Sequence, residues 1–557
     1  MPDIFTLENK IKQMIDDLKG LTASYGLSNQ ASEENIITSV FLYKFLNDKF
    51  MSNLHAFADR MELSYEDLLE DKDMMDGFYD TFPQDVAMTY EDTIEYLVNK
   101  TTQPKFYELF NKALENISDN PKNAEFSIET ADGEKKPLFT RLMDYVDSVD
   151  RNNFTISLFG IISQDKFDFS DAFKNNFDFY SAIFEYLIKD YNVASGKYAE
   201  YFTPQTVSSI IAKILVNMEP VEDKIYEIYD PSAGSGSLVL HLANELGKGS
   251  FGEKAHVYTQ DISDKSTRFL RINMMLNGLT QSFDNIIKGD TLMAPAHYNI
   301  PHEPSSGVKC FDFITSNPPF KMDFSATRND IESTWEDSER REGLRRFFAG
   351  VPKIPNTKKE SMAIYLMFIQ HILWSLKDEG KAAIVVPTGF LTAQSGIEKT
   401  IRQEIVGKRW LKGVISMPSN IFANTGTNVS ILFIDKSNVD GEIMLVDASK
   451  LGEKVKDGKN QRTVLSQKEI EQIENAVINQ EEREDFSIKV TYEQVAKNNY
   501  SFFAGQYFEV KVEYVELTPE AFLARMAAYK SNLDVLFSEG KSLERKLREK
   551  LEEIKYE

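Results

Sequence analysis

The 557-residue sequence is poor in cysteine and in long apolar runs. Cys310 is its single cysteine, so an internal disulfide framework is excluded and a reducing cytoplasm is the simplest location. No run of about 18 uncharged apolar residues predicts a transmembrane helix. The charged, amphipathic N-terminus, MPDIFTLENKIKQM, lacks the apolar core of a signal peptide. We therefore expect a cytoplasmic protein with no membrane partner.

Motifs for several kinds of catalysis are also missing. The phosphate-binding pattern GxxxxGK[ST] does not occur, which argues against a P-loop motor. Neither HExxH nor a pair of CxxC motifs is present, so the sequence predicts no metal site. The net charge of −24 argues against a protein that holds nucleic acid by a broad basic surface. DNA remains an allowed substrate, because a local basic groove or a basic partner subunit could supply the phosphate contacts.

The apolar pattern changes twice along the chain, whose length predicts two or three domains. The N-terminal part has helical periodicity, whereas between about 196 and 447 short β-like runs alternate with helical stretches, which predicts a doubly wound α/β sheet. The seven runs are IYEIYD, HVYTQDI, NIIKGD, FDFITSNPP, KAAIVVP, LKGVISMP and VSILFID. We expect a helical N-terminal domain at 1–160, an α/β catalytic domain at 161–480 and a helical C-terminal tail at 481–557.

The C-terminal tail ends in a helix with a seven-residue repeat. The repeat positions are Leu533, Gly540, Leu547 and Ile554, with Leu536 and Leu543 at the complementary spacing. Such a helix either docks on a partner or packs on its own domain, and the pattern leaves both open. The N-terminal helices are equally compatible with an ordinary bundle that has no chemistry of its own.

A glycine-rich turn follows the first predicted strand of the α/β region. It contains Asp230, Ser232, Gly234, Ser235, Gly236 and Ser237. Glycine lets backbone N–H groups approach a ligand, and the N-terminus of the next helix favours a carboxylate or phosphate. Asp261 and Asp290 end the next two strands, where carboxylates can accept from ribose hydroxyls and contact an adenine ring. One such acid is more often a helix cap, but three at successive strand ends favour a nucleotide-like ligand.

The tetrapeptide Asn317, Pro318, Pro319, Phe320 follows the fourth predicted strand. Proline fixes φ and has no N–H, so its carbonyl and the asparagine side chain offer two acceptors side by side. Two acceptors that hold the hydrogens of an amino group on a planar heterocycle would localise its nitrogen lone pair and make it a nucleophile. Phe320 would stack on the ring. The alternative is a Pro-Pro strand terminator without chemistry.

The order of these motifs resembles the amino-methyltransferases that use S-adenosylmethionine, and in particular the methylation subunits of type I restriction-modification systems. The resemblance covers nearly the whole chain. It extends to GKYAEYFTPQ at Gly196–Gln205, FLYKFLNDKF at Phe41–Phe50, GKAAIVVP at Gly380–Pro387 and MPSNIF at Met417–Phe422. One departure is Asp261, where the family often has glutamate, and a carboxylate is retained. The terminal helix resembles the family's tail in pattern rather than in residues.

The resemblance implies an α/β, Rossmann-like S-adenosylmethionine-dependent methyltransferase core with a helical N-terminal domain and a helical C-terminal arm. The cofactor S-adenosyl-L-methionine would be held by the glycine turn, by Asp261 at the ribose and by Asp290 at the adenine. A further cofactor segment would comprise Glu200, Tyr201, Phe202, Thr203, Pro204 and Gln205. Asn317 and the Pro318 carbonyl would bind N6 of an adenine flipped from the duplex, next to Pro319, with Phe320 stacked on it.

The resemblance also implies partners. They are double-stranded DNA, a specificity subunit that chooses the site, a second copy of this chain and a restriction subunit. Two alternative functions are a protein glutamine N-methyltransferase, whose substrate has a similar planar NH2, and a catalytically idle scaffold subunit. Cys310 lies in VKCFDF without a Pro-Cys loop, which opposes cytosine C5 methylation.

A polar stretch at 321–359 follows the NPPF motif. It contains Arg340, Arg341, Arg345 and Arg346, followed by Phe347 and Phe348. Such a charge run is commonly a solvated helix face. Its position favours a loop that orders over DNA and contacts phosphates.

Overall fold

The structure is a computed structural model, and it describes residues 4–28, 31–82, 85–126, 128–129, 135–170, 203–218, 224–247, 254–277, 279–301, 303–342, 346–422, 428–439, 441–457, 460–508 and 518–553. Contacts along the chain divide it into two compact units, Met1–Tyr507 and Phe508–Glu557. The regions with helical and α/β patterns lie in the first unit, and the helix with the seven-residue repeat lies in the second.

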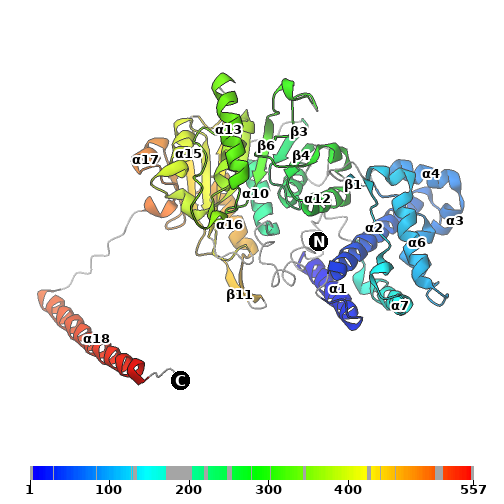
Figure 1. Cartoon of the computed structure of the whole chain (residues 1–557), viewed down its shortest axis with the longest axis horizontal. Helices are drawn as coiled ribbons and strands as arrows, with labels where there is room; N and C mark the ends of the chain where they lie inside the picture. Colours follow the sequence, from blue (N-terminus) through cyan, green and yellow to red (C-terminus); the bar gives the residue numbers. More distant parts are fainter. Residues whose placement is uncertain are drawn as a thin grey trace. The chain divides into compact units, whose positions relative to one another are not determined.

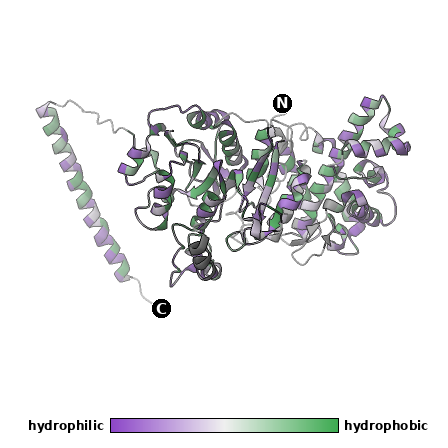
Figure 2. Ribbon diagram, turned by 90° about the horizontal axis from the view of Figure 1, so that it is seen from above, coloured by the Kyte–Doolittle hydropathy of each residue, from purple (hydrophilic) through white to green (hydrophobic). Residues whose placement is uncertain are grey.

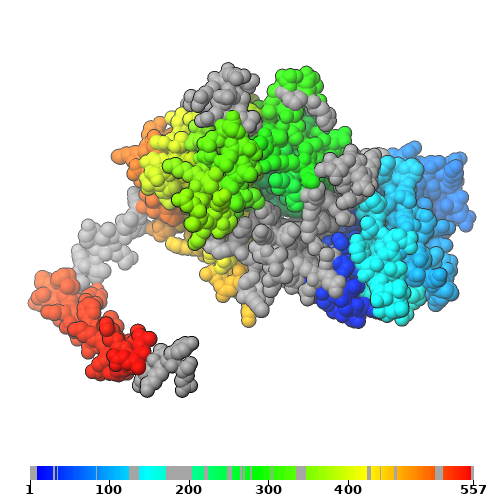
Figure 3. Space-filling model, in the orientation of Figure 1, coloured from blue at the N-terminus to red at the C-terminus, as the bar shows by residue number. Residues whose placement is uncertain are grey.

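The N-terminal part of the first unit is helical. Its helices are α1 (Ile4–Ser24), α2 (Ala31–Met61), α3 (Tyr65–Glu70), α4 (Lys72–Thr81), α5 (Ile94–Val98), α6 (Phe106–Asp119) and α7 (Arg151–Ile162). In α2, residues 41–48 are buried without interruption, so the middle of the helix is enclosed on all sides. Figure 3 shows these helices as one packed body, coloured from blue to cyan.

Short elements connect these helices. A two-stranded antiparallel ribbon pairs β1 (Ile128–Glu129) with β2 (Lys135–Lys136). The 3-10 helices of this part are Tyr90–Asp92, Pro121–Phe126, Leu142–Tyr145 and Asp165–Phe167. The domain boundary expected at residue 160 stays a prediction.

A nine-stranded sheet forms the α/β part of the first unit (Figure 1). Its strands are β3 (Tyr226–Asp230), β4 (Ala255–Asp261), β5 (Ile286–Lys288), β6 (Phe311–Ser316), β7 (Leu376–Pro387), β8 (Leu411–Ser416), β9 (Val429–Asp435), β10 (Ile443–Asp447) and β13 (Ser487–Val490). Their order is β13-β10-β8-β9-β7-β6-β3-β4-β5. β9 is antiparallel to β7 and β8, and β13 is antiparallel to β10, whereas the other neighbours are parallel.

All seven β-like runs of the sequence form strands of this sheet, which confirms the predicted doubly wound α/β class. The sequence patterns missed β10 and β13. β13 follows residue 481 and pairs with β10. The domain boundary expected at 481 stays a prediction. A hairpin of β11 (Glu453–Asp457) and β12 (Asn460–Val464) stands apart from the sheet.

Helices cover the sheet because its strands are apolar on both faces. The helices of the α/β part are α10 (Gln205–Asn217), α11 (Ser237–Gly247), α12 (Asp264–Leu276), α13 (Ser325–Glu342), α14 (Tyr365–Ser375), α15 (Gly396–Gly407), α16 (Gln467–Ile478) and α17 (Tyr492–Lys497). Ala383 and Val385 of β7 belong to the same apolar core as α10 and α11. Ile384 and Val386 alternate with them and are also buried, so they face the opposite side of the sheet.

The remaining short elements of the α/β part are 3-10 helices. They are Thr280–Asn285, Pro304–Ser306, Lys359–Ser361, Thr388–Leu391 and Ala504–Gln506. Among the described residues, no helix is long and apolar enough to cross a membrane.

The strand order creates a switch point between β3 and β6. The chain runs from β3 to β4 and β5 in one direction, and then returns to place β6 on the other side of β3. These four strands are parallel, so their carboxyl ends lie at one edge of the sheet. In open α/β sheets, ligands bind outside the carboxyl ends of the strands at such a point. The glycine turn follows β3, and the Asn317 motif follows β6.

The second unit contains one described helix, α18 (Pro519–Glu553), of 35 residues. Hydrophobic and hydrophilic residues alternate along it (Figure 2). Its large apolar side chains are exposed, including Leu536 at 61% and Leu543 at 66%.

Candidate active site

The glycine turn adopts a backbone that requires its glycines. Gly234 has φ +54° and Gly236 has φ +83°. A Cβ on Gly236 would lie 2.1 Å from Cδ1 of Leu270 in α12, so both the backbone and the packing exclude a side chain there. The turn leads directly into α11, whose first residue, Ser237, lies 3.1 Å through its Oγ from Oγ of Ser208 in α10. The turn is therefore held against two helices.

Asp230 begins the turn at the end of β3. Its Oδ1 accepts a hydrogen bond from the Ser232 N–H at 2.9 Å. The side chain is buried, and burial raises the pKa of Asp230 well above its ordinary value, against the lowering effect of the Ser232 N–H. Nearby Asp261 raises it further. Asp230 therefore shapes the turn from within, and its carboxyl is a poor candidate for direct contact with a solvent-borne ligand.

Asp261 connects β4 to the glycine turn. Its Oδ2 accepts from the Gly234 N–H at 2.9 Å, and its Oδ1 accepts from the Ser263 N–H at 2.8 Å. Burial raises the pKa of Asp261, while these two N–H groups lower it. Each carboxylate oxygen has about two acceptor positions, so one position on each remains beside the backbone bonds. The carboxylate can accept two further donors.

Asp290 follows β5 and contacts an element that sequence reasoning did not connect with the site. Its Oδ1 accepts from the N–H groups of Leu292 at 3.0 Å and Met293 at 3.3 Å. Its Oδ2 accepts from the hydroxyl of Thr327 at 3.2 Å. Thr327 lies in the first turn of α13, within the segment that follows Phe320. No signal in the sequence separates this threonine from others on a charged helix.

The Asn317 motif lies beside the glycine turn. Oγ of Ser316, the last residue of β6, is 2.7 Å from Oγ of Ser232. The Asn317 side chain is 8% exposed, and its Nδ2 donates to Oγ1 of Thr203 at 3.1 Å. This bond orients the amide and turns its Oδ1 away from Thr203. The hydroxyl of Thr203, predicted to hold cofactor, thus contacts the predicted base-binding asparagine.

The other residues of the NPPF motif form a buried turn with an aromatic tip. Pro318 and Pro319 are buried, and Phe320 is partly buried. The Phe320 ring packs edge-on against the ring of Tyr365 in α14, with centroids 6.3 Å apart. Tyr365 in turn contacts Phe390. Tyr365 thus supports the aromatic tip from one side and is itself supported by Phe390.

The remaining predicted residues divide into those with an observed role and those outside the described part. Glu200, Tyr201 and Phe202 lie outside the described residues. Pro204 precedes α10, and its carbonyl accepts from the N–H groups of Val207 and Ser208, so it begins the helix. Gln205 is the first residue of that helix. The carbonyl of Ser235 accepts from Asn273 Nδ2 at 3.2 Å, which ties the turn to α12.

The expectation of phosphate contacts is wrong for Arg346, which is buried at 1% exposure. Its guanidinium donates to the carbonyls of Thr291 at 2.6 Å and Leu292 at 2.8 Å, and its Nε donates to Nδ1 of His371 at 3.1 Å. Phe347 is also buried. The side chains of Arg340, Arg341 and Arg345 lie outside the described residues. A guanidinium so enclosed cannot reach a DNA phosphate.

A buried histidine accepts one of these bonds. Burial, together with the charge of Arg346 and then His297, lowers the pKa of His371 well below its ordinary value. A neutral ring is what the bond from Arg346 requires, because Nδ1 must be an acceptor. His371 Nε2 lies 3.3 Å from the hydroxyl of Tyr229 in β3. The segment after the NPPF motif is therefore fixed to the loop after β5 and to α14.

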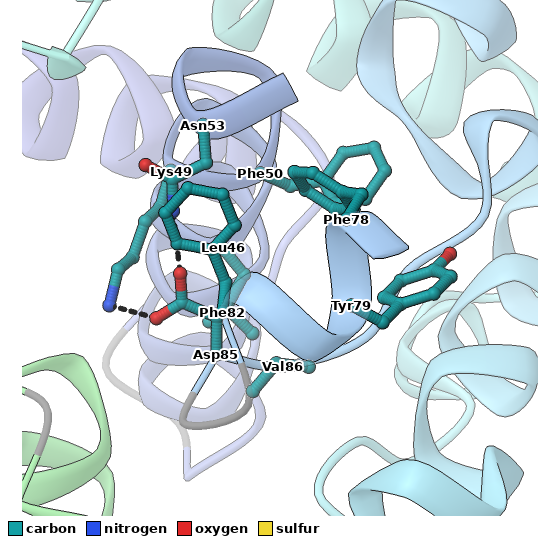
Figure 4. Close-up of a pocket in the computed structure, with 9 residues that line it drawn as sticks. All are labelled: Leu46, Lys49, Phe50, Asn53, Phe78, Tyr79, Phe82, Asp85 and Val86. Atoms are coloured by element: carbon teal, nitrogen blue, oxygen red, sulfur yellow. Dashed lines mark hydrogen bonds and ion pairs between the residues drawn. The ribbon is translucent and has the colours of Figure 1, made fainter. Parts of the chain in front are cut away.

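A hollow in the N-terminal helices is a competing location for a site (Figure 4). It is lined mostly by apolar and aromatic side chains of α2 and α4. Its polar groups satisfy one another, since Lys49 Nζ lies 2.5 Å from Asp85 Oδ1 and Asn53 Nδ2 donates to Asp85 Oδ2 at 2.5 Å. None of the predicted site residues lines it. Among the described residues, no cluster of His, Cys, Asp or Glu is arranged to hold a metal ion.

Comparisons with known proteins show the family of this chain. Residues 175–514 match the family model described as N-6 DNA Methylase. The chain is 27% identical to the methylase subunit of the type I restriction enzyme MpnII of Mycoplasma pneumoniae over 99% of this chain and 96% of that protein.

Two solved structures share the fold. The methyltransferase subunit of a type I restriction-modification system from Streptococcus thermophilus superposes with a TM-score of 0.66 at 21% identity, covering 90% of this chain and 100% of that one. A modification subunit of a putative type I restriction enzyme from Vibrio vulnificus gives 0.51 at 15% identity, covering 88% of this chain and 93% of that one. The resemblance found in the sequence motifs is confirmed.

Proposed function

The chain belongs to the N-6 DNA methylase family, and from that premise we propose that it transfers a methyl group from S-adenosylmethionine to N6 of an adenine in DNA. It would act as the methylation subunit of a type I restriction-modification system. The observation that carries the proposal is the contact between the two motifs. At the switch point of the sheet, the Ser232 hydroxyl is hydrogen-bonded to the Ser316 hydroxyl, and the Asn317 amide donates to the Thr203 hydroxyl.

The residues at this edge of the sheet fit S-adenosylmethionine. The two acceptor positions left on Asp261 match the two hydroxyls of a ribose. The glycine turn leads into the N-terminus of α11, where backbone N–H groups favour a carboxylate. Gly236 has no side chain in this turn, and the packing leaves no room for one. Asp290 retains one acceptor position on Oδ2 for the amino group of the adenine. When bound, the cofactor supplies an electrophilic methyl group.

The Asn317 motif would hold the substrate amino group. Thr203 takes the NH2 end of the Asn317 side chain, so the Oδ1 end is oriented to accept a hydrogen from that group. The Pro318 carbonyl would accept the second hydrogen. Because both hydrogens are then held in place, the nitrogen lone pair is directed at the methyl group, and catalysis arises mainly from positioning. Phe320, braced by Tyr365, would stack on the flipped base.

Site choice would come from another subunit. The net charge of −24 is unfavourable for a chain that must hold DNA alone. A specificity subunit would supply the sequence readout, and we propose that α18 docks on it through its exposed apolar repeat. A second copy of this chain would complete the modification complex, which a restriction subunit could join. A cytoplasmic location follows from the same proposal.

The experiment is methyl transfer by an Asn317→Ala variant. Wild type, assembled with its specificity subunit, should transfer labelled methyl groups from S-adenosylmethionine to DNA, and sequencing of modified bases should place them on adenine N6. The variant loses a hydrogen-bond acceptor for the amino group that receives the methyl group. We therefore expect the rate of methyl transfer to fall about 100- to 1,000-fold. Cofactor affinity should change little.

The matched control is Asn479→Ala, which removes the same side chain at an exposed position after α16. Its activity should equal that of wild type. Retention of activity by Asn317→Ala would show that the assigned role is wrong. Methylation of a protein glutamine, or cofactor binding without any transfer, would replace the proposal by one of the alternatives.

A further inference from the structure

The segment that follows the NPPF motif contacts the loop of residues 290–292 in three separate ways. The first is the hydrogen bond from the Thr327 hydroxyl to Asp290 Oδ2, at 3.2 Å. The second is the pair of bonds from Arg346 to the carbonyls of Thr291 and Leu292, the two residues after Asp290. The third is an apolar cluster that contains Leu292 together with Phe324, Ile331 and Phe347.

These contacts fix the position of Thr327 independently of its own hydrogen bond. Ile331, one turn further along α13, is 1% exposed, and Phe324 just before the helix is 5% exposed. The start of the helix is held by Asp323, whose Oδ1 accepts from the Ser325 N–H at 3.0 Å. A side chain between two buried anchors has little freedom. The Thr327 hydroxyl therefore lies at the Asp290 carboxylate because the helix is docked there.

The hydrogen bonds of Asp290 leave room for one more donor. Oδ1 already accepts from two backbone N–H groups, which use its two acceptor positions. Oδ2 accepts from Thr327, which uses one of its two. Together with the two N–H bonds to Oδ1, the hydroxyl fixes the rotation of the carboxylate and leaves a single position for an N–H donor. A carbonyl at the same place would face a negative charge.

We propose that Thr327 is a positioning residue for the adenine end of the cofactor site. Its hydroxyl holds Asp290 so that the carboxylate accepts from a 6-amino group and rejects a 6-oxo group. Through it, the segment that begins at the base-binding motif also forms part of the cofactor site, so the two ligands are linked by one stretch of chain. This inference rests on the proposed function, because it assumes that the adenine of S-adenosylmethionine lies at Asp290.

The test measures binding rather than turnover. Calorimetric titration of the full-length protein uses S-adenosylhomocysteine and S-inosylhomocysteine, which differ in carrying a 6-amino or a 6-oxo group. Wild type should prefer the amino compound by about ten-fold or more, since a site built for a donor rejects the analogue that lacks it. Thr327→Val, which removes only the hydroxyl, should weaken the amino compound about three- to ten-fold. The oxo compound should change by less than two-fold.

Two variants separate positioning from a general effect on the fold. Thr327→Ser retains a hydroxyl and should restore the preference for the amino compound. Ser333→Ala removes a hydroxyl from the same helix that bonds only to the Asp330 carbonyl in the described contacts, and it should bind like wild type. A merely structural role of Thr327 would weaken both compounds alike.

The outcomes distinguish this inference from the proposed function. If Thr327→Val binds both compounds as wild type does, or loses both equally, Thr327 is not a positioning residue and the proposed function stands. If wild type binds the two compounds equally well, Asp290 does not read the 6-amino group and the inference is wrong. If wild type binds neither, the proposed function fails and the inference fails with it.

Discussion

Two helices of this chain, α13 and α18, are both rich in charged residues but differ in the burial of their apolar side chains. α13 carries a buried residue, Ile331, and its Arg328 donates to the Pro352 carbonyl at 3.0 Å. In α18 the described ion pairs are internal, such as Arg548 with Glu544, and apolar side chains such as Leu536 stay more than half exposed. The apolar side chain of Ile331 in α13 is therefore covered by other residues of the same chain. The helix α18 presents an apolar repeat that its described surroundings do not cover.

The largest effect should come from breaking the attachment of the α13 segment. Arg346→Met leaves the carbonyls of Thr291 and Leu292 without their buried donor. Unsatisfied buried acceptors cost about 1–3 kcal/mol each, so we expect the free energy of unfolding to fall by roughly 3 kcal/mol or more. Urea denaturation followed by circular dichroism measures the change. Cofactor affinity should fall as well, because Asp290 precedes these residues.

The matched control for Arg346 lies on the other helix. Arg548→Met removes an exposed arginine whose partner is Glu544 in the same helix. Exposed pairs of this kind contribute about 0.3–0.5 kcal/mol, so its stability should hardly differ from wild type. Equal effects of the two substitutions would contradict the distinction between the helices.

A second large effect should concern assembly and leave stability unchanged. Leu536→Glu combined with Leu543→Glu places charges in the exposed apolar repeat of α18. If this face docks on the specificity subunit, we expect affinity for that subunit to fall about 100-fold, as for buried residues at the centre of an interface. The unfolding of the first unit and the binding of cofactor should not change. Titration of the two purified subunits measures the affinity.

The control adds the same charge to the opposite face of α18. Ser531→Glu with Ser538→Glu lies away from the repeat and should bind the specificity subunit like wild type. Equal loss in both double variants would indicate a charge effect. No loss in either would mean that α18 is not the docking helix, and a change in self-association alone would assign it to contacts between copies of this chain.

The sequence predicts the scaffold of this molecule better than it predicts the contacts around the site. The seven strands are recognisable because each is a short apolar run between helices, and the carboxyl ends of parallel strands meet at one edge of the sheet. This rule places the glycine turn and the Asn317 motif at the same edge of the sheet. Their proximity also requires β3 and β6 to be neighbours, which the sequence did not predict. By contrast, β13 is a four-residue strand next to a helical region, and its length gives too little pattern to identify it.

Contacts between distant segments could not be predicted. Arg346 belongs to a run of charged residues, and only the tertiary structure brings it under Leu292 and His371. The Thr203 hydroxyl is 114 residues from the Asn317 amide that it orients. In both cases the residue type is common and the local pattern is uninformative. What decides the role is which carbonyl, amide or carboxylate the fold places at hydrogen-bonding distance.

The smallest expected effect is a pH dependence of the unfolding free energy that comes from His371, which contacts the α13 segment through Arg346. The pKa of His371 is lowered well below its ordinary value in the folded protein, so below pH 6.5 the unfolded chain takes up a proton that the folded chain does not. Stability that His371 contributes at pH 7.5 is therefore lost as the pH falls. As the pH falls from 7.5 to 5.5, wild type should lose about 1.4 kcal/mol of unfolding free energy relative to His371→Gln.

His55→Gln is the control for this measurement, because it removes a histidine from an exposed position of α2. Residues 508–557 contain no histidine, so a chain that lacks them should show the same pH response as the full chain. A His371→Gln difference that stays constant with pH would mean that the ring is accessible to protons in the folded state. The α13 segment would then be held to α14 less firmly than the bond from Arg346 to His371 implies.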